Sequence, residues 1–317
     1  MKISVIIPTY NRRALIGAAI NSALWQEGVS TEVIVVDDGS TDDTVAWLAD
    51  IYAQQPLRVM HNARMHGPAG ARNTGILSAT GDLIAFLDSD DIFLPGHLAS
   101  SAAALTRFPE VGLVFGLALY ELDGQPVDYM GPNFERKLAL APTRYSDAEL
   151  SVFTDAYFDH LLECGCYFNL STVVLRSSAA RTLMREELRI AEDFEMWVRL
   201  SRNYRFACLH RPQIRYVLHK QNVSFETVGG TADHAPELLA AYEIMLRYPD
   251  LSPAQIFTIR RQMATVLFSW GYRCRLAGDL GAAASLYLRS LRLGLRRKSA
   301  LALGKLAVLA LTTRRAS

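Results

Sequence analysis

Three carboxylates follow an apolar run in the segment FLDSDD at residues 86–91. Asp88, Asp90 and Asp91 would repel one another if they packed together without a counter-charge, because neighbouring like charges cannot all stay ionised in a partly dry site. Mg²⁺ or Mn²⁺ supplies such a charge when it is held by one or two carboxylates and the phosphates of a substrate. The spacing therefore predicts a site for a metal ion and a phosphate group.

Polar residues also follow two other apolar runs. Pro8, Thr9 and Asn11 come after the first run of the chain, and Asp37 and Asp38 come after the second. Because ligands of an open parallel sheet bind beyond the carboxyl ends of its strands, we expect these groups to converge on one crevice. The short apolar runs that predict strands buried on both faces cover residues 3–7, 32–36, 57–60 and 83–87.

Helical patterns fill the gaps between these strands. Apolar residues recur at three- and four-residue spacing over 15–24, with Asn11 as the expected N-cap. After the second strand, Ser40 or Thr41 caps a helix that starts at Asp42. Strands that alternate with helices predict an α/β fold with a doubly wound, mostly parallel sheet.

The middle of the chain is less regular, and its end is helical. The middle is predicted to hold strands at 111–120 and 171–175, helices at 153–162 and 192–201, and a long loop at 131–147. Past Pro236 no strand pattern remains. Consecutive helices are predicted there, at 236–248, 253–278 and 280–297.

The composition bounds the class of protein. Half of the 317 residues are apolar, which suffices for one large α/β domain with an appendage or for two smaller domains. The net charge of +1 argues against a nucleic-acid partner. Four cysteines without metal-ligand spacing suit a reducing compartment, and Pro8 follows the first apolar run too early for a signal peptide. We therefore expect a cytoplasmic protein.

Five segments in order resemble the motif set of family 2 glycosyltransferases with the GT-A fold. They are PTYN at 8–11, VVDDGSTDDT at 35–44, GPAGARNTG at 67–75, LDSDD at 87–91 and EDFEMWVRL at 192–200. The resemblance implies a glycosyltransferase domain over 1–230, with a Rossmann-like nucleotide-binding half at 1–100 and an acceptor half at 101–230. A C-terminal helical region follows at 231–317.

The resemblance also implies an activity. A family member transfers a sugar, with inversion, from a nucleotide-sugar donor to a hydroxyl group. We expect the donor to be a UDP-sugar and the acceptor to be a glycan or lipid-linked sugar in cell-surface polysaccharide synthesis. Mg²⁺ or Mn²⁺ is the expected cofactor.

The site residues are carried over from the matching motifs. The donor nucleotide is expected to contact Pro8, Thr9, Asn11, Asp38, Arg72 and Asp88. The metal is expected to be held by Asp90 and Asp88, with a weaker match implying His219. Asp91 is either a further ligand or the N-cap of the following turn, and Gly70 either allows a tight turn or a close approach to the donor.

Asp193 is the residue that the resemblance implies as the catalytic base, beside Glu192. A helix N-terminus favours the ionised carboxylate, which keeps the base ready near neutral pH. Without the resemblance, both acids would be interpreted as first-turn residues that complement the helix dipole.

The C-terminal segment 280–317 contains no acidic residue. Its basic residues are interspersed with Leu, Val and Ala, and Lys305 divides an apolar stretch at 300–311 that is too short to span a bilayer. One interpretation is a basic amphipathic helix on an anionic membrane, which would make the protein peripheral on the inner face of the cell membrane. The other is a packed helix with a solvated basic face.

Two other functions remain open at this point. A nucleotidyltransferase that makes sugar nucleotides also joins an α/β fold to metal-bound phosphates, but PTYNRR at 8–13 lacks its glycine-rich signature. The same segment lacks the G-x-G-x-x-G of a dinucleotide site. A non-catalytic nucleotide-binding protein would not need Asp88, Asp90 and Asp193.

Overall fold

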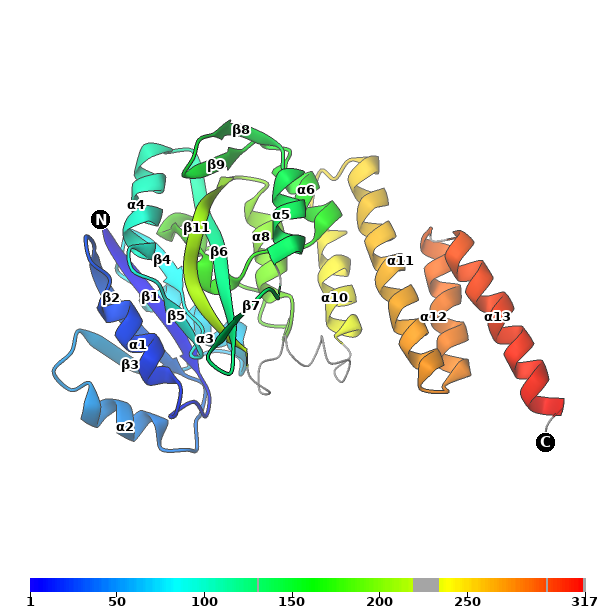
Figure 1. Ribbon diagram of the computed structural model, residues 1–317, viewed down its shortest axis with the longest axis horizontal. Coiled ribbons are helices and arrows are strands. Elements are labelled where there is room, and N and C mark those ends of the chain that lie inside the picture. The colour runs from blue at the N-terminus through cyan, green and yellow to red at the C-terminus, as the bar shows by residue number, and fades with distance from the viewer. Residues whose placement is uncertain (130, 219–233, 295, 316–317) are drawn as a thin grey trace. The chain divides into compact units, whose positions relative to one another are not determined.

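The computed structural model describes residues 1–129, 131–218, 234–294 and 296–315. The chain divides into two compact units, Met1–Phe225 and Glu226–Ser317. Each unit has its own arrangement of elements (Figure 1). Over the described residues, the first is built on one eleven-stranded sheet and the second is built from helices.

The N-terminal half of the first unit is a parallel sheet with the strand order β3-β2-β1-β4. Its strands are β1 (Lys2–Thr9), β2 (Ser30–Asp37), β3 (Leu57–His61) and β4 (Leu83–Phe86). The helices between them are α1 (Ile16–Leu24), α2 (Thr44–Ile51) and α3 (Pro68–Ser78). All four predicted strands are confirmed, and so is the alternation of strands with helices (Figure 1).

The predicted helix caps in this half are wrong. Leu15 precedes α1 and Asp43 precedes α2, and neither makes a side-chain cap hydrogen bond. Asn11 instead accepts a hydrogen bond from the Thr41 backbone at 2.7 Å, and its own backbone N–H donates to Ser40 Oγ at 2.9 Å. These polar residues therefore join the loops after β1 and β2 to each other.

The second half of this unit mixes strand directions. From β4 the sheet continues through β10, β6, β11, β9 and β8, and only β6 and β11 pair in parallel along this path. The strands are β5 (Asp91–Phe93), β6 (Val111–Leu122), β7 (Gln125–Val127), β8 (Thr143–Ser146), β9 (Leu150–Phe153), β10 (Val174–Arg176) and β11 (Arg205–Leu218). The helices are α4 (His97–Arg107), α5 (Gly131–Ala139), α6 (Tyr157–Cys164), η1 (Leu170–Thr172), α7 (Ser177–Ala180) and α8 (Glu192–Leu200).

The predicted loop at 131–147 is wrong, because it contains α5 and β8. The buried ring of Phe134 lies edge-on to Phe115 and to Tyr167, with centroids 6.4 and 5.7 Å apart. β8 is held by antiparallel pairing with β9. Contacts with distant parts of the chain therefore stabilise a segment whose local sequence is typical of a loop.

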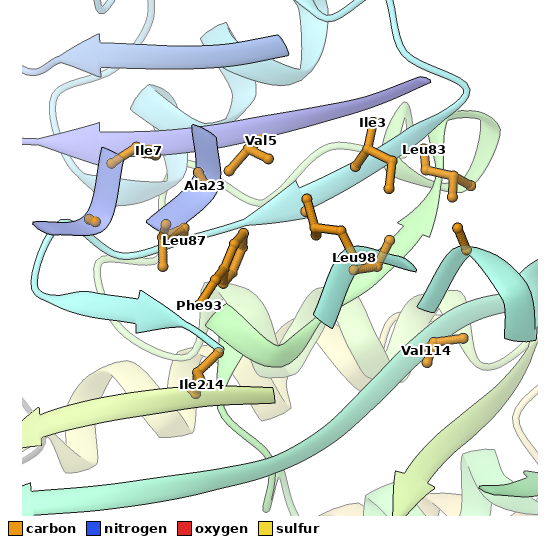
Figure 2. Close-up of a cluster of buried hydrophobic side chains, with 14 of the residues drawn as sticks. Ile3, Val5, Ile7, Ala23, Leu83, Leu87, Phe93, Leu98, Val114 and Ile214 are labelled. Atoms are coloured by element: carbon orange, nitrogen blue, oxygen red, sulfur yellow. The ribbon is translucent and has the colours of Figure 1, made fainter. Parts of the chain in front are cut away.

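The core of the first unit lies against both faces of the parallel strands. Figure 2 shows Ile3, Val5 and Ile7 of β1 beside Leu83 and Leu87, all of which are buried. Consecutive residues of β1 and β2 are also inaccessible to solvent, which is typical of strands covered on both sides. This burial on both faces explains why β1 and β2 appear in the sequence as continuous apolar runs.

The second unit contains α10 (Ala235–Met245), α11 (Pro253–Leu276), α12 (Leu280–Leu293) and α13 (Arg296–Arg315). Gly294, with a φ of 131°, ends α12, so the predicted single helix over 280–297 is wrong. No helix in the described part of the chain is both long and apolar enough to cross a membrane.

Buried contacts tie α11, α12 and α13 together. Tyr287 of α12 and Leu306 of α13 belong to one buried cluster. A Cβ at Gly271 of α11 would lie 3.0 Å from the Tyr287 ring, so glycine permits this close approach. Ser299 Oγ donates to Ser290 Oγ at 3.0 Å, and Ser290 Oγ donates to a carbonyl of α11 at 2.6 Å.

Candidate active site

A cavity of about 850 Å³ opens at the carboxyl ends of β1, β2 and β4. The N-terminal turns of α3 and α8 contribute to its walls. Of the residues predicted from sequence, those that line it are Pro8, Thr9, Asp38, Arg72, Asp88, Asp90, Glu192 and Asp193. The cavity thus joins groups from all five of the motif segments.

The end of the cavity next to β1 and β2 is organised by Asp38. Its Oδ2 accepts a hydrogen bond from the Gly67 backbone at 2.8 Å and lies 2.9 Å from His66 Nδ1. Its Oδ1 accepts from Asn62 Nδ2 at 2.6 Å. Asp38 therefore fixes the segment between β3 and α3 against the end of β2.

Beside Asp38, the Thr9 hydroxyl is buried and has no hydrogen-bond partner among the described residues. Tyr10 is half exposed, and its ring meets the exposed His66 ring edge-on with centroids 6.3 Å apart. An unused hydroxyl behind two accessible rings can receive a planar polar ligand such as a nucleobase.

Arg72 lies at the centre of the acidic groups. Its Nη2 donates to Asp88 Oδ1 and its Nη1 donates to Glu192 Oε1, both at 2.7 Å. Burial lowers the pKa of the guanidinium, but the charges of Asp88 and Glu192 outweigh burial and raise that pKa above its ordinary value. Arg72 therefore stays charged and holds one carboxylate with each of its two terminal nitrogens.

Glycine positions set the placement of Arg72 on α3. A Cβ at Gly75 would lie 2.4 Å from Ile6 Cγ2, so α3 packs directly on β1. A Cβ at Gly70 would lie 1.9 Å from the carbonyl oxygen of Met65. Gly70 does not line the cavity, so the close approach that requires it is to the protein backbone.

Glu192 and Asp193 begin α8, and the preceding Ala191 has a φ of 66°. Asp193 Oδ1 accepts a hydrogen bond from the Phe194 backbone at 2.6 Å. Burial raises the pKa of both carboxyls above their ordinary values, against the opposing charge of Arg72. A carboxylate with a raised pKa is a stronger proton acceptor than one in water.

The two acids of the predicted metal site, Asp88 and Asp90, both line the cavity. The described residues contain no group of three or more His, Cys, Asp or Glu side chains that could hold a metal ion. Two carboxylates nevertheless suit Mg²⁺ or Mn²⁺, because these ions bind through few protein ligands when substrate phosphates supply the others. His219 lies outside the described residues.

Besides Gly70, two other predicted residues lie apart from the cavity. Asp91 is buried at the start of β5, where its Oδ2 accepts a hydrogen bond from Ser171 Oγ at 2.6 Å. Burial raises its pKa well above the ordinary value. Asn11 does not line the cavity either, because its side chain joins two loops as described above.

Sequence reasoning missed several lining residues from the second half of the unit. They include Phe168, Asn169, Arg189 and Tyr216. The Phe168 ring stacks on Phe115 with centroids 3.9 Å apart, and Asn169 caps η1 by accepting from the Ser171 backbone. No spacing pattern marks these residues, and Phe168 and Tyr216 are placed by non-local contacts with β6.

Comparisons with known proteins agree with this arrangement. The family model described as glycosyl transferase family 2 matches residues 4–147. The succinoglycan biosynthesis protein ExoO of Rhizobium meliloti is 32% identical over 255 residues, which cover 77% of this chain and 68% of that protein.

Other relatives share shorter segments. An uncharacterized glycosyltransferase of Nostoc is 34% identical over 143 residues, 44% of each chain. The UDP-Glc:α-D-GlcNAc-diphosphoundecaprenol β-1,3-glucosyltransferase WfgD of Escherichia coli is 40% identical over 105 residues, 33% of this chain. The matches thus span 44% of the Nostoc relative's length and 41% of the E. coli one's.

Solved structures share the fold at low identity. Staphylococcus aureus TarS, residues 1–349 with UDP-GlcNAc, has a TM-score of 0.65 at 20% identity, covering 92% of this chain and 83% of that one. The mannosyltransferase PcManGT of Pyrobaculum calidifontis, with GDP-Man and Mn²⁺, has a TM-score of 0.58 at 18% identity, covering 98% of this chain and 80% of that one.

Proposed function

Because the chain belongs to family 2 of the glycosyltransferases and has the GT-A fold, we propose that it transfers a sugar, with inversion, from a UDP-sugar to an acceptor hydroxyl. The chain is a glycosyltransferase, so the nucleotidyltransferase and the non-catalytic binder are set aside. The observation that carries the proposal is the single cavity in which Asp38, the acids after β4 and Asp193 meet.

The nucleotide of the donor binds at the end of the cavity formed by Thr9, Tyr10 and Asp38. The buried Thr9 hydroxyl hydrogen-bonds the base or the ribose, and Asp38 holds the Gly67 loop that borders the base. Uridine is supported by the E. coli relative, named as a UDP-Glc enzyme, and by the fold of TarS, solved with UDP-GlcNAc.

The diphosphate binds near Asp88 and Asp90. These two carboxylates would hold Mg²⁺ or Mn²⁺ together with the phosphate oxygens, and His219 is the expected third protein ligand. When bound, the ion supplies charge relief for the departing diphosphate. Arg72 orients Asp88 and keeps one positive charge in the cavity.

Asp193 is the base of the proposed reaction. The acceptor oxygen forms a bond to the anomeric carbon while the bond from that carbon to the diphosphate breaks, and the hydroxyl proton moves to the Asp193 carboxylate. A single displacement inverts the anomeric centre, so an α-linked donor gives a β-linked product. Glu192 is held away from this role by its hydrogen bond to Arg72.

The acceptor enters from the side lined by Phe168, Asn169 and Tyr216. Phe168 and Tyr216 are largely buried and form the apolar wall on this side, and the amide of Asn169 is the polar group that can bond a sugar hydroxyl. The E. coli relative is named for a diphosphoundecaprenol acceptor, and the R. meliloti relative is named for succinoglycan biosynthesis. We therefore assign the acceptor to a glycan or lipid-linked sugar of a cell-surface polysaccharide.

The proposed site of action is the cytoplasm, on the inner face of the cell membrane. The four cysteines of the described structure are free thiols, which suit a reducing compartment.

Calorimetric titration with UDP and with GDP, each with and without Mn²⁺, tests the donor and metal assignments. We expect UDP to bind more tightly with Mn²⁺, and we expect Asp90→Ala to remove that metal dependence. Asp82→Ala is the matched control, because Asp82 is an exposed acid just before β4 and does not line the cavity. Binding of GDP alone would overturn the UDP assignment, and equal binding with and without Mn²⁺ would overturn the metal site.

A further inference from the structure

Helices α11, α12 and α13 carry a large positive charge, although the net charge of the whole chain is only +1. Of the 33 Lys and Arg residues, 12 lie in 253–317, whereas Asp279 is the single acid of that stretch. Residues 1–252 hold the remaining 21 basic and 31 acidic residues. A chain with a net charge of +1 therefore ends in a strongly cationic segment.

The exposed face of α12 alternates cations with a leucine. Leu288 and its neighbour Arg289 are exposed, and so is Arg292 one helical turn later; Leu288 is 46% exposed. Leu286 and Tyr287 are buried on the other side of the helix. One face of α12 therefore packs against its neighbours, and the opposite face exposes a leucine beside two arginines.

The described part of α13 repeats this pattern. Arg297, Leu301 and Lys305 are exposed and follow one another at four-residue spacing, and Leu301 is 68% exposed. Ser299 and Leu306 are buried on the opposite side. Two successive helices thus present leucines flanked by basic side chains.

This combination fits an anionic lipid surface. Leucine side chains gain free energy when they leave water for the boundary between headgroups and acyl chains, while Arg and Lys remain at the level of the phosphates. Each cation near such a surface adds attraction that salt screens. A helix that only packs against its neighbours and faces water on its other side needs neither the exposed leucines nor the absence of acids. A nucleic acid would bind the cations, but it offers the leucines no apolar environment.

We propose that the exposed faces of α12 and α13 dock the protein on a membrane that contains anionic phospholipid. The proposal concerns a surface outside the donor cavity and does not rest on the proposed reaction. Its effect on function, which does rest on the proposed lipid-linked acceptor, is to hold the enzyme on the surface where that acceptor is concentrated.

Co-sedimentation of the full chain with vesicles tests the proposal. We expect binding to vesicles that contain phosphatidylglycerol but not to pure phosphatidylcholine. Raising salt from about 0.1 M to about 1 M shortens the screening length from about 10 Å to about 3 Å and should release the protein. Equal binding to both vesicle types, or no binding to either, would overturn the proposal.

Matched variants locate the surface. Arg289→Gln with Arg292→Gln should weaken vesicle binding about 25-fold, from about fivefold for each charge. Arg144→Gln with Arg181→Gln removes the same charge from exposed positions of the first unit and should leave binding unchanged. If both pairs weakened vesicle binding equally, the binding would depend on the net charge of the protein and not on this surface, which would contradict the proposal.

A third variant separates a lipid surface from other anionic partners. Leu288→Ala with Leu301→Ala should weaken vesicle binding while leaving the circular dichroism spectrum unchanged, because both side chains are exposed. If this variant binds vesicles as the parent does, and the parent binds duplex DNA equally well, the surface is a polyanion site. If light scattering shows an oligomer that Arg289→Gln with Arg292→Gln dissociates, it is an interface between copies.

Discussion

The donor cavity and the helices α11 to α13 use charge in opposite ways. In the cavity, Arg72 lies between Asp88 and Glu192 and is buried, so each charge has a defined partner at a defined distance. On the helices, many cations face water with one acid in the whole segment. A buried charge therefore affects stability through its own ion pairs, whereas exposed charges matter through the total charge of the surface that carries them.

The largest effect is expected from Asp193→Asn, which removes the proposed base without changing its size. We expect kcat to fall about 1,000-fold, because general-base catalysis contributes about 10²- to 10⁴-fold. Initial rates would measure the loss, and calorimetry should show that donor binding is nearly intact.

The matched control for Asp193→Asn is Asp159→Asn, which changes an exposed acid in the first turn of another helix, α6. Its rate should stay within about twofold of the parent, since exposed substitutions rarely matter. Loss of donor binding in the Asp193 variant would reassign that residue from catalysis to binding.

The same Arg→Gln substitution should separate the two regions. Arg72→Gln leaves Asp88 and Glu192 without their buried counter-charge and should lower the free energy of unfolding by about 3–5 kcal/mol. Arg289→Gln changes an exposed side chain and should alter it by less than about 0.5 kcal/mol. Urea titrations of both variants measure these changes in the free energy of unfolding. If the two changes were similar, the buried and the exposed arginine would not differ in the way described.

A Gly→Ala pair should differ in sign between the two regions. At Gly70 the new Cβ meets the Met65 carbonyl oxygen at 1.9 Å, and we expect a loss of about 1–3 kcal/mol or more. At Gly304 of α13 no atom lies within 4 Å of the Cβ position, and alanine should stabilise the helix by about 1 kcal/mol. Thermal unfolding would measure both, and destabilisation at Gly304 would show that α13 is more closely packed than its exposure indicates.

The smallest effect concerns an acid outside the cavity. Burial would raise the pKa of Glu32, but hydrogen bonds from Ser4, Thr80 and Lys2 outweigh it and lower that pKa to about 2. A lowered native pKa stabilises the fold above the unfolded pKa of about 4.5, and this stabilisation is lost as pH falls toward 2.

Glu32→Gln should therefore lower the stability at pH 7 and lose its effect near pH 2. Urea titrations across this range, on the parent and the variant, would measure it. A difference that stays constant with pH would mean that the Glu32 charge is not what holds Ser4 and Thr80.

The parallel half could be predicted because its signals are local. β1, β2 and β4 are largely buried on both faces and appear as continuous apolar runs, whereas the edge strand β3 is partly exposed. The acids after β2 and β4 follow directly from strand ends. Asn11 was misinterpreted because its side chain bonds across to the loop after β2, which a scan along one segment does not consider.

The other misses have a common physical cause. The helix α5 depends on packing of Phe134 against rings from distant parts of the chain, so its own polar sequence is a poor guide. Tyr216 lies on β11, which pairs with β6 about 100 positions earlier in the chain, and Phe168 stacks on Phe115 of β6. Both therefore reach the cavity through contacts that are distant in sequence. By contrast Asp193, Arg72 and Glu192 stand in the segments that resemble the family's motifs, and all three line the cavity.

Folding leaves the Thr9 hydroxyl inside the protein without a hydrogen bond from the described residues. Removing such a group from water costs about 1–3 kcal/mol when no partner replaces it. In the proposed donor complex, a ligand atom that bonds Thr9 would recover that free energy, so part of the affinity for the donor would already be set when the sheet closes over β1. The unliganded fold is accordingly expected to be less stable than the same fold with an apolar side chain there, so that recognition at this position would lower the stability of the free protein.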